Sequence, residues 1–244
     1  MIAVERLAKQ FGIVRALREV SFVAQDGRIT GLLGANGAGK STTLRIIATM
    51  LRPDSGRALV DGHDCAKESL TVLSRLGVLP HASGLYPNLT ARENLRYYGA
   101  LHGLPPSVIE QRIGAWTERL ELSELLDRRT KGFSHGQKLK VALARALIHA
   151  PRNVILDEPT SGLDIGATRA LRDLIRGLRD QGCCVLLSSH IMQEVSALCD
   201  DIVIIAQGGV VASGTPEQIL ASTRAADLEE AFMQATGLQG ESAA

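Results

Sequence analysis

Short apolar runs alternate along the chain with segments whose apolar residues recur at helical spacing. Runs such as Ile29–Leu33 and Ile202–Ala206 are apolar throughout, as in strands buried on both faces. Segments such as Lys40–Leu51 place apolar side chains three and four residues apart, which predicts helices. The alternation predicts a parallel sheet covered by helices on both faces. Further strands are expected at Ser21–Ala24, Arg57–Val60, Asn153–Leu156 and Cys183–Ser188, and further helices at His135–Ala150, Gly166–Asp180 and Ile191–Cys199.

The segment from about residue 84 to 134 has a different pattern. Thr90–Leu101, Pro105–Leu120 and Ser123–Asp127 each predict a helix that Thr, Pro or Ser opens. We therefore expect a helical insertion between two parts of one core. The expected divisions are 1–83 and 135–215 for the core, 84–134 for the helical subdomain, and 216–244 for a tail with two short helices.

Composition and charge narrow the class of protein. The 244 residues are 45% hydrophobic and 22% charged, which excludes wholesale disorder. A net charge of +1 and 3% aromatic residues argue against a nucleic-acid partner. None of the four cysteines forms a CxxC pair, so buried reduced thiols are expected. The first residues lack an apolar signal segment, and no apolar run approaches the roughly 20 residues of a membrane span, so we expect a cytoplasmic protein.

A glycine-rich loop joins the Ile29–Leu33 strand to the helix that follows it. The loop matches GxxxxGK[ST], and a strand before it with a helix after it is the context that confirms the motif. Its glycines let backbone N–H groups surround a phosphate at the positive end of a helix, whereas the alternative is a turn without a ligand. Lys40 would meet the outer phosphates, and the Ser41 hydroxyl would bind Mg²⁺. The expected phosphate-binding residues are Gly34, Ala35, Asn36, Gly37, Ala38, Gly39, Lys40, Ser41 and Thr42.

Two acids and a histidine follow later apolar strands. Asp157 and Glu158 end the Asn153–Leu156 run, and buried carboxylates must be paired or solvated. Beside a phosphate loop, Asp157 suits Mg²⁺ and Glu158 suits an attacking water, although two solvated acids before a turn are the plainer alternative. His190 follows the Cys183–Ser188 strand. Because the carboxyl ends of parallel strands share one edge, His190 is expected to sense the γ-phosphate there.

A second loop prepared for an anion opens the helix at 135. Ser134 is a good N-cap, and Gly136 leaves the backbone open. One nucleotide does not need two such loops on one face, so this loop is expected to serve a nucleotide held by another copy. Simple helix capping is the alternative explanation of the same residues.

Taken together, these motifs resemble the ATP-binding cassette family over nearly the whole chain. GANGAGKST resembles its Walker A loop, FSHGQ its signature, VILDEP its Walker B segment, SGLD at 161–164 its D-loop, and His190 its switch histidine. Phe11 lies where the family places an aromatic ring against adenine. The resemblance implies an α/β fold of the P-loop NTPase, RecA-like type: a mostly parallel sheet, an N-terminal antiparallel β subdomain and an inserted α-helical subdomain.

The resemblance also implies a function. ATP and Mg²⁺ would bind between two copies packed head-to-tail, with Ser134, Gly136 and Gln137 of one copy and Asp164 of its D-loop completing the site. Glu158 and His190 would be catalytic, and Ser41 and Asp157 would hold the metal. ATP-driven dimerisation would power a separate integral membrane permease from the cytoplasmic face of the plasma membrane. The tail is similar to that of ABC-2-type exporter ATPases, within which sodium-efflux-like proteins are the most similar group.

Two residues depart from the family pattern. His81 stands where the family usually has a glutamine that contacts Mg²⁺. A histidine nitrogen is softer and sensitive to pH, so metal contact at His81 is in question. His135 stands where the signature has its first glycine, and its side chain could either add a donor to a phosphate or crowd it.

Two other classes of protein compete with a transporter ATPase. A non-transport cassette that acts on ribosomes or DNA is the main alternative, but such proteins usually carry two cassettes, long arms or a strongly basic surface. A GTPase or a small-molecule kinase would leave FSHGQ unexplained, and the chain has no NKxD motif.

Overall fold

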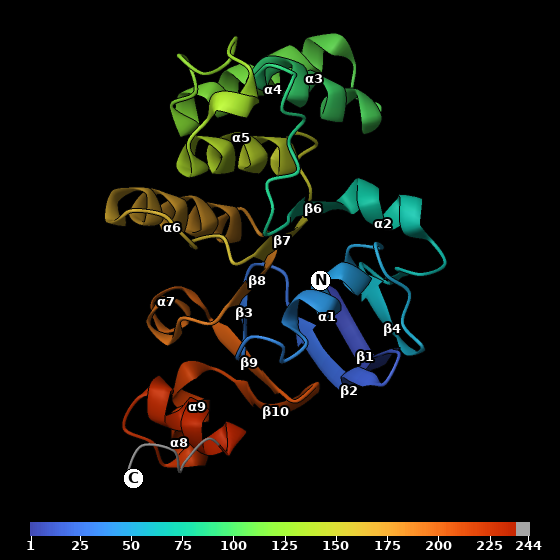
Figure 1. Cartoon of the computed structure of the whole chain (residues 1–244), viewed down its shortest axis with the longest axis vertical. Coiled ribbons are helices and arrows are strands. Elements are labelled where there is room, and N and C mark those ends of the chain that lie inside the picture. Colours follow the sequence, from blue (N-terminus) through green and yellow to red (C-terminus); the bar gives the residue numbers. More distant parts are fainter. Residues whose placement is uncertain (238–244) are drawn as a thin grey trace.

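Six strands form the central sheet in the order β10-β9-β3-β8-β7-β6 (Figure 1). All neighbours are parallel except β10, which pairs antiparallel with β9 at the edge. Every residue of β3 and of β8 is buried, which confirms the prediction of strands covered on both faces. The strands are β3 (Ile29–Leu33), β6 (Leu76–Leu79), β7 (Asn153–Asp157), β8 (Cys184–Ser189), β9 (Asp201–Ala206) and β10 (Gly209–Gly214). The computed structural model describes residues 1–237.

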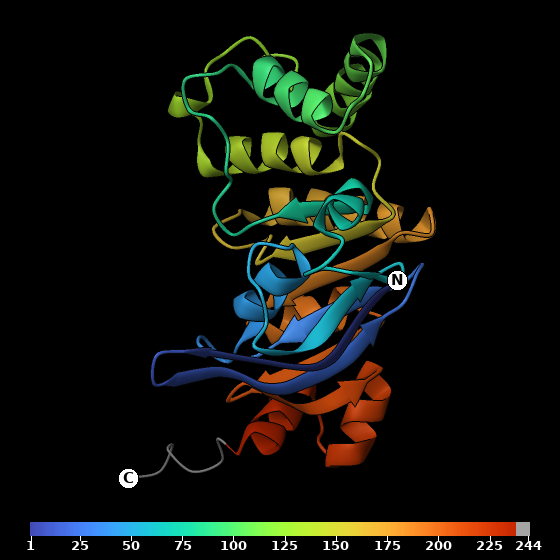
Figure 2. The ribbon, with the colours of Figure 1, turned by 90° about the vertical axis from the view of Figure 1, so that its right-hand side faces the viewer.

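A second, antiparallel sheet has the order β2-β1-β4-β5. Its strands are β1 (Ile2–Phe11), β2 (Val14–Ala24), β4 (Ser55–Val60) and β5 (His63–Asp64). Their apolar side chains, with those of α1 (Lys40–Ile47), form one core against a face of the central sheet. Figure 2 shows the long β1–β2 hairpin extending to one side of the molecule. This sheet confirms the N-terminal antiparallel subdomain.

Helices form a separate layer at one end of the molecule (Figure 1). It contains α3 (Ala91–Leu101), α4 (Pro106–Leu120) and α5 (His135–Leu147). Thr90 begins α3 in a capping box, because its hydroxyl accepts from the Glu93 N–H while the Glu93 carboxylate accepts from the Thr90 N–H. Helix α5 packs both on α3 and on β6, so it joins this layer to the central sheet.

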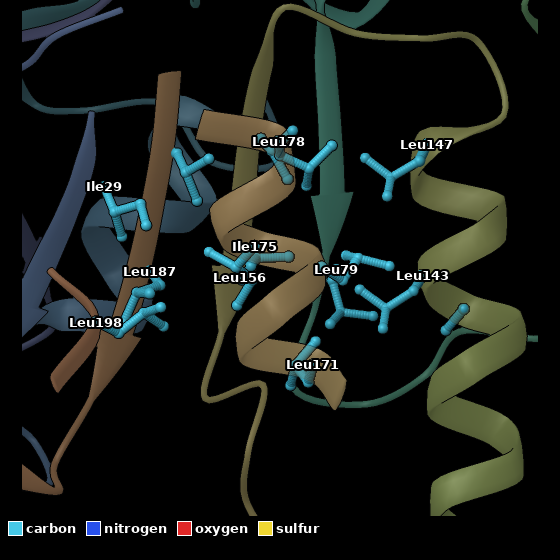
Figure 3. Packing of buried hydrophobic residues seen from close by; sticks show 14 of the residues in the cluster. Ile29, Leu79, Leu143, Leu147, Leu156, Leu171, Ile175, Leu178, Leu187 and Leu198 are labelled. Atoms are coloured by element: carbon cyan, nitrogen blue, oxygen red, sulfur yellow. The ribbon is translucent and has the colours of Figure 1, made fainter. Parts of the chain in front are cut away.

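A second core joins this layer to the central sheet. Figure 3 shows Leu143 and Leu147 of α5 beside Leu79 of β6, with Leu171 and Ile175 of α6 (Ile165–Asp180) nearby. Helix α7 (Met192–Leu198) packs on the same face of the sheet. The chain then forms α8 (Pro216–Thr223) and α9 (Leu228–Thr236), the two expected tail helices. The end of the expected tail, 238–244, lies outside the described residues.

Several local predictions are wrong. Ser123–Asp127 forms hydrogen-bonded turns instead of a helix, with Leu125 and Leu126 both donating to the Leu122 carbonyl. The first helix ends at Ile47 instead of Leu51, because Thr49 has a φ of 61° and reverses the chain. Strand β6 and the preceding helix α2 (Ser69–Arg75) were not expected, since each is too short for a clear period.

The remaining general expectations concern cysteines and membrane spans. The four cysteines are free, and three are buried, whereas Cys183 is half-buried. Within residues 1–237, no helix has the length and apolar character that crossing a bilayer requires.

Candidate functional site

The phosphate-binding loop, 34–41, follows β3 and ends in α1. Gly37 and Gly39 have φ values of 80° and 114°, which side-chain-bearing residues rarely adopt. A Cβ on Gly34 would lie 2.5 Å from the Ile205 carbonyl oxygen, so the close passage of β9 requires glycine there. The loop therefore has the backbone conformation that lets N–H groups face an anion.

Lys40 is the cation of this loop. Its side chain is only 5% exposed, and its Nζ donates to the Gly34 carbonyl at 2.6 Å and to the Ala35 carbonyl at 3.2 Å. Burial lowers the pKa of Lys40, while Glu158 and Asp157 act in the opposite direction. A buried ammonium beside backbone carbonyls is a strong site for phosphate oxygens.

Asp157 ends β7 beside the loop. Its Oδ1 accepts from the Ser188 hydroxyl at 2.6 Å and lies 3.4 Å from the Ser41 hydroxyl. A hydroxyl and a carboxylate are oxygen ligands of the kind that Mg²⁺ prefers, and they face each other from different elements. Ser41 and Asp157 thus fit the expected metal.

Glu158 follows in a strained conformation with a φ of 50°. Its N–H donates to the Ser188 hydroxyl at 3.0 Å, and its Oε1 lies 3.2 Å from His190 Nδ1 and 3.9 Å from Lys40 Nζ. The carboxylate is 16% exposed and therefore stands between the phosphate loop and His190 with some access to water. This is the placement that a group orienting a water molecule needs.

The order of the strands explains why these groups meet. β3, β8 and β7 are adjacent and parallel, so the loop after β3, His190 after β8 and the acids after β7 all emerge at one edge. The structure brings together Lys40, Ser41, Asp157, Glu158 and His190, as the sequence predicted.

The signature loop, Phe133–Gln137, lies elsewhere. Ser134 and Gln137 form a capping box, in which Ser134 Oγ accepts from the Gln137 N–H at 3.2 Å and Gln137 Oε1 accepts from the Ser134 N–H at 3.0 Å. Figures 1 and 2 place α5 in the helical layer, well away from α1. Within one chain these residues cap a helix, so any contact with a phosphate requires another copy.

Three other residues that the sequence predicted for the site lie outside this cluster of side chains. Asp164 is the N-cap of α6, where its Oδ1 accepts from the Ala167 N–H at 2.8 Å. Phe11 is 47% exposed at the end of β1, with the Lys9 ammonium 5.6 Å from its ring centre. His81 is exposed and lines, with Asp157, a hollow of about 360 Å³. No hydrogen bond joins His81 to Ser41 or Asp157.

Two residues of the site were not predicted. Ser188 supports both acids through its hydroxyl, as described above. Glu194, in the first turn of α7, accepts from the hydroxyls of Thr160 and Ser189. The serines next to His190 are visible in the sequence, whereas nothing in the sequence indicates that Glu194 meets Thr160.

Residues 17–161 match the family model described as ABC transporter. The chain is 45% identical over 222 residues to the ABC transporter ATP-binding protein NatA of Bacillus subtilis, covering 91% of this chain and 90% of NatA. It is 34% identical over 232 residues to the Nod factor export ATP-binding protein I of Ralstonia nicotianae, covering 95% of this chain and 72% of that protein. A solved ATP binding subunit of an ABC transporter superimposes with a TM-score of 0.90 at 32% identity, covering 97% of this chain and 99% of that one.

Proposed function

The chain belongs to the ABC transporter ATP-binding family, and from that premise we propose how its residues bind and hydrolyse ATP. It is an ATPase subunit of an ABC transporter. The catalytic roles are assigned from one observation: the Glu158 carboxylate lies 3.9 Å from Lys40 Nζ and 3.2 Å from His190 Nδ1 at one edge of the sheet. None of the relatives named above is described as a non-transport protein.

ATP binding begins at the phosphate loop. The backbone N–H groups of residues 37–41 would surround the β-phosphate, and Lys40 would exchange its loop carbonyls for phosphate oxygens. The exposed ring of Phe11 offers a surface for adenine. Mg²⁺, held by Ser41 and Asp157, would neutralise charge on the phosphates when bound. Ser188 keeps Asp157 oriented for that task.

Hydrolysis depends on Glu158. Its carboxylate lies between Lys40 and His190. It would orient a water molecule and accept a proton from it as the water attacks the γ-phosphoryl group. His190, whose side chain is 44% exposed, can reach the γ-phosphate from the same edge. Glu158 and His190 are therefore the proposed catalytic pair.

A second copy would complete the site. ABC ATPase cassettes dimerise and act with membrane permeases, and we propose the head-to-tail homodimer for this chain. The separation of α5 from α1 supports it, because the loop with Ser134, Gly136 and Gln137 opens α5 and so lies away from the phosphate loop of its own chain. We propose that Asp164, the N-cap of α6, contributes to the site of the partner copy as well. ATP between the copies would close the dimer, and hydrolysis would open it.

We propose that the transporter exports its cargo. Similarity to NatA and to a protein named for Nod factor export supports an ABC-2-type exporter, of the sodium-efflux-like group. Such a subunit would lie on the cytoplasmic face of the plasma membrane against an integral membrane permease.

The test compares three proteins: the wild-type chain, Lys40→Ala and Glu158→Gln. Lys40→Ala should lose ATP binding, because the loop loses its side-chain cation. Glu158→Gln should bind ATP, hydrolyse it at least about a hundredfold more slowly, and accumulate as a dimer in light scattering. Tight ATP binding by Lys40→Ala, or normal turnover by Glu158→Gln, would contradict the proposed roles.

A further inference from the structure

His135 contacts its own chain instead of standing free at the start of α5. Its Nε2 lies 2.9 Å from the Ser161 carbonyl oxygen, and its ring passes Gly162, where a Cβ would lie 3.6 Å from Cδ2. A carbonyl oxygen only accepts, so Nε2 carries the hydrogen. The signature loop is thus hydrogen-bonded to the D-loop of the same chain.

Helix capping does not require this contact. Ser134 and Gln137 already satisfy the first turn of α5 through their reciprocal hydrogen bonds. His135 follows the N-cap, and its side chain takes no part in that pair. The bond to Ser161 therefore has a consequence outside α5.

A groove lies beside the two loops. Behind them, a groove of about 340 Å³ separates α5 from α6, with Leu139 and Leu143 on one wall and Leu171 and Leu174 on the other. Near the loops themselves, a Cβ on Gly136 would just touch Leu163 at 3.9 Å. Between the two loops themselves, the bond from His135 to Ser161 is the one hydrogen bond that the described residues show.

The D-loop is in turn continuous with the catalytic turn. The Ser161 N–H donates to the Glu158 carbonyl at 3.2 Å, and the Leu163 N–H donates to the Thr160 carbonyl at 3.1 Å. Glu158 itself has the strained φ of 50°, so its side-chain direction depends on the turn that follows it. A shift of Ser161 would therefore disturb the turn that maintains this conformation of Glu158.

We infer that His135 is a positioning residue, whose bond to Ser161 holds the D-loop and thereby aims Glu158 of the same chain. This inference rests on the proposed role of Glu158 in hydrolysis. It assigns to His135 a task within its own chain, where a glycine at this position would supply no donor. The helical layer and the catalytic turn then move as one unit.

Two substitutions separate the donor from the rest of the side chain. His135→Gln places an amide nitrogen where Nε2 stands, whereas the shorter His135→Asn places it near the position of Nδ1 and cannot reach Ser161. Both replacements are polar and neutral, and both leave the Ser134–Gln137 capping box intact. The full-length chain is used, with ATP hydrolysis and amide hydrogen exchange over residues 158–164 as readouts.

His135→Asn should lower kcat about five- to tenfold, the loss of one neutral hydrogen bond, with KM within about twofold of wild type. Exchange over 158–164 should quicken in the same variant, and His135→Gln should restore both quantities. Equal exchange and kcat in all three proteins would overturn the inference, as would a rise in KM without a fall in kcat, which indicates direct contact with a partner's nucleotide. If the wild-type chain hydrolyses no ATP, the proposed function fails, while exchange still decides whether His135 holds the D-loop.

Discussion

A stacked pair of half-buried histidines makes the stability of this chain sensitive to mild acid. His149, just after α5, stacks on His102, at the end of α3, with ring centres 3.6 Å apart and an interplanar angle of 4°. Neither ring nitrogen of His149 has a hydrogen-bond partner among the described residues. Burial, followed by His102 and the Arg112 guanidinium, lowers the pKa of His149 from 6.5 to about 4, although the Leu76 backbone acts in the opposite direction.

The sign of the effect follows from proton linkage. Below pH 6.5 His149 becomes protonated in the unfolded chain, whereas in the folded chain it stays neutral until the pH falls to about 4. Falling pH therefore favours the unfolded chain, and the stabilising contribution of neutral His149 is lost across this window. With a pKa of 6.5 in the unfolded chain and about 4 in the folded chain, the free energy of unfolding falls by about 2 kcal/mol between pH 7 and pH 5.

Urea unfolding followed by circular dichroism at the two pH values measures this loss. His149→Phe keeps an aromatic ring against His102 but cannot be protonated, so it should lose about 2 kcal/mol less than wild type on acidification. His102→Phe is the matched control, because burial remains the leading cause of the shift at His149 and most of the pH dependence should persist. An identical loss in wild type and His149→Phe would refute the reasoning.

Three other outcomes are expected. Arg145→Lys should lower the free energy of unfolding in urea by about 2 to 3 kcal/mol, because a lysine cannot reproduce the guanidinium hydrogen bonds to the Ser83 and Gly84 carbonyls. Stability equal to that of the wild type would contradict this. Gly31→Ala should cost about 1 to 3 kcal/mol, since its Cβ would lie 2.7 Å from Cys199 Sγ, whereas Gly114→Ala, with open space on α4, should be neutral or stabilising. His81→Gln should leave ATP affinity unchanged and shift the Mg²⁺ or pH dependence of hydrolysis, and an unchanged profile would show that His81 is silent.

Local chemistry explains why much of this protein can be inferred from its sequence. The glycines and Lys40 of the phosphate loop, and the acids that end β7, are contiguous motifs whose neighbours already dictate a strand–loop–helix or strand–turn context. Helices with a strong apolar period, such as α4 and α6, are predicted within a few residues of their observed bounds. Short elements such as β6 fail because a few residues cannot establish a period.

Contacts between distant segments depend instead on strand order and on how the layers pack. That β8 lies between β3 and β7 places Ser188 under both acids, and no local pattern specifies that neighbour. The turn of His135 toward Ser161 and the stacking of His102 on His149 join residues 26 and 47 positions apart. Local motifs act through backbone conformation near each residue, whereas these pairings depend on how the two cores pack against a shared sheet.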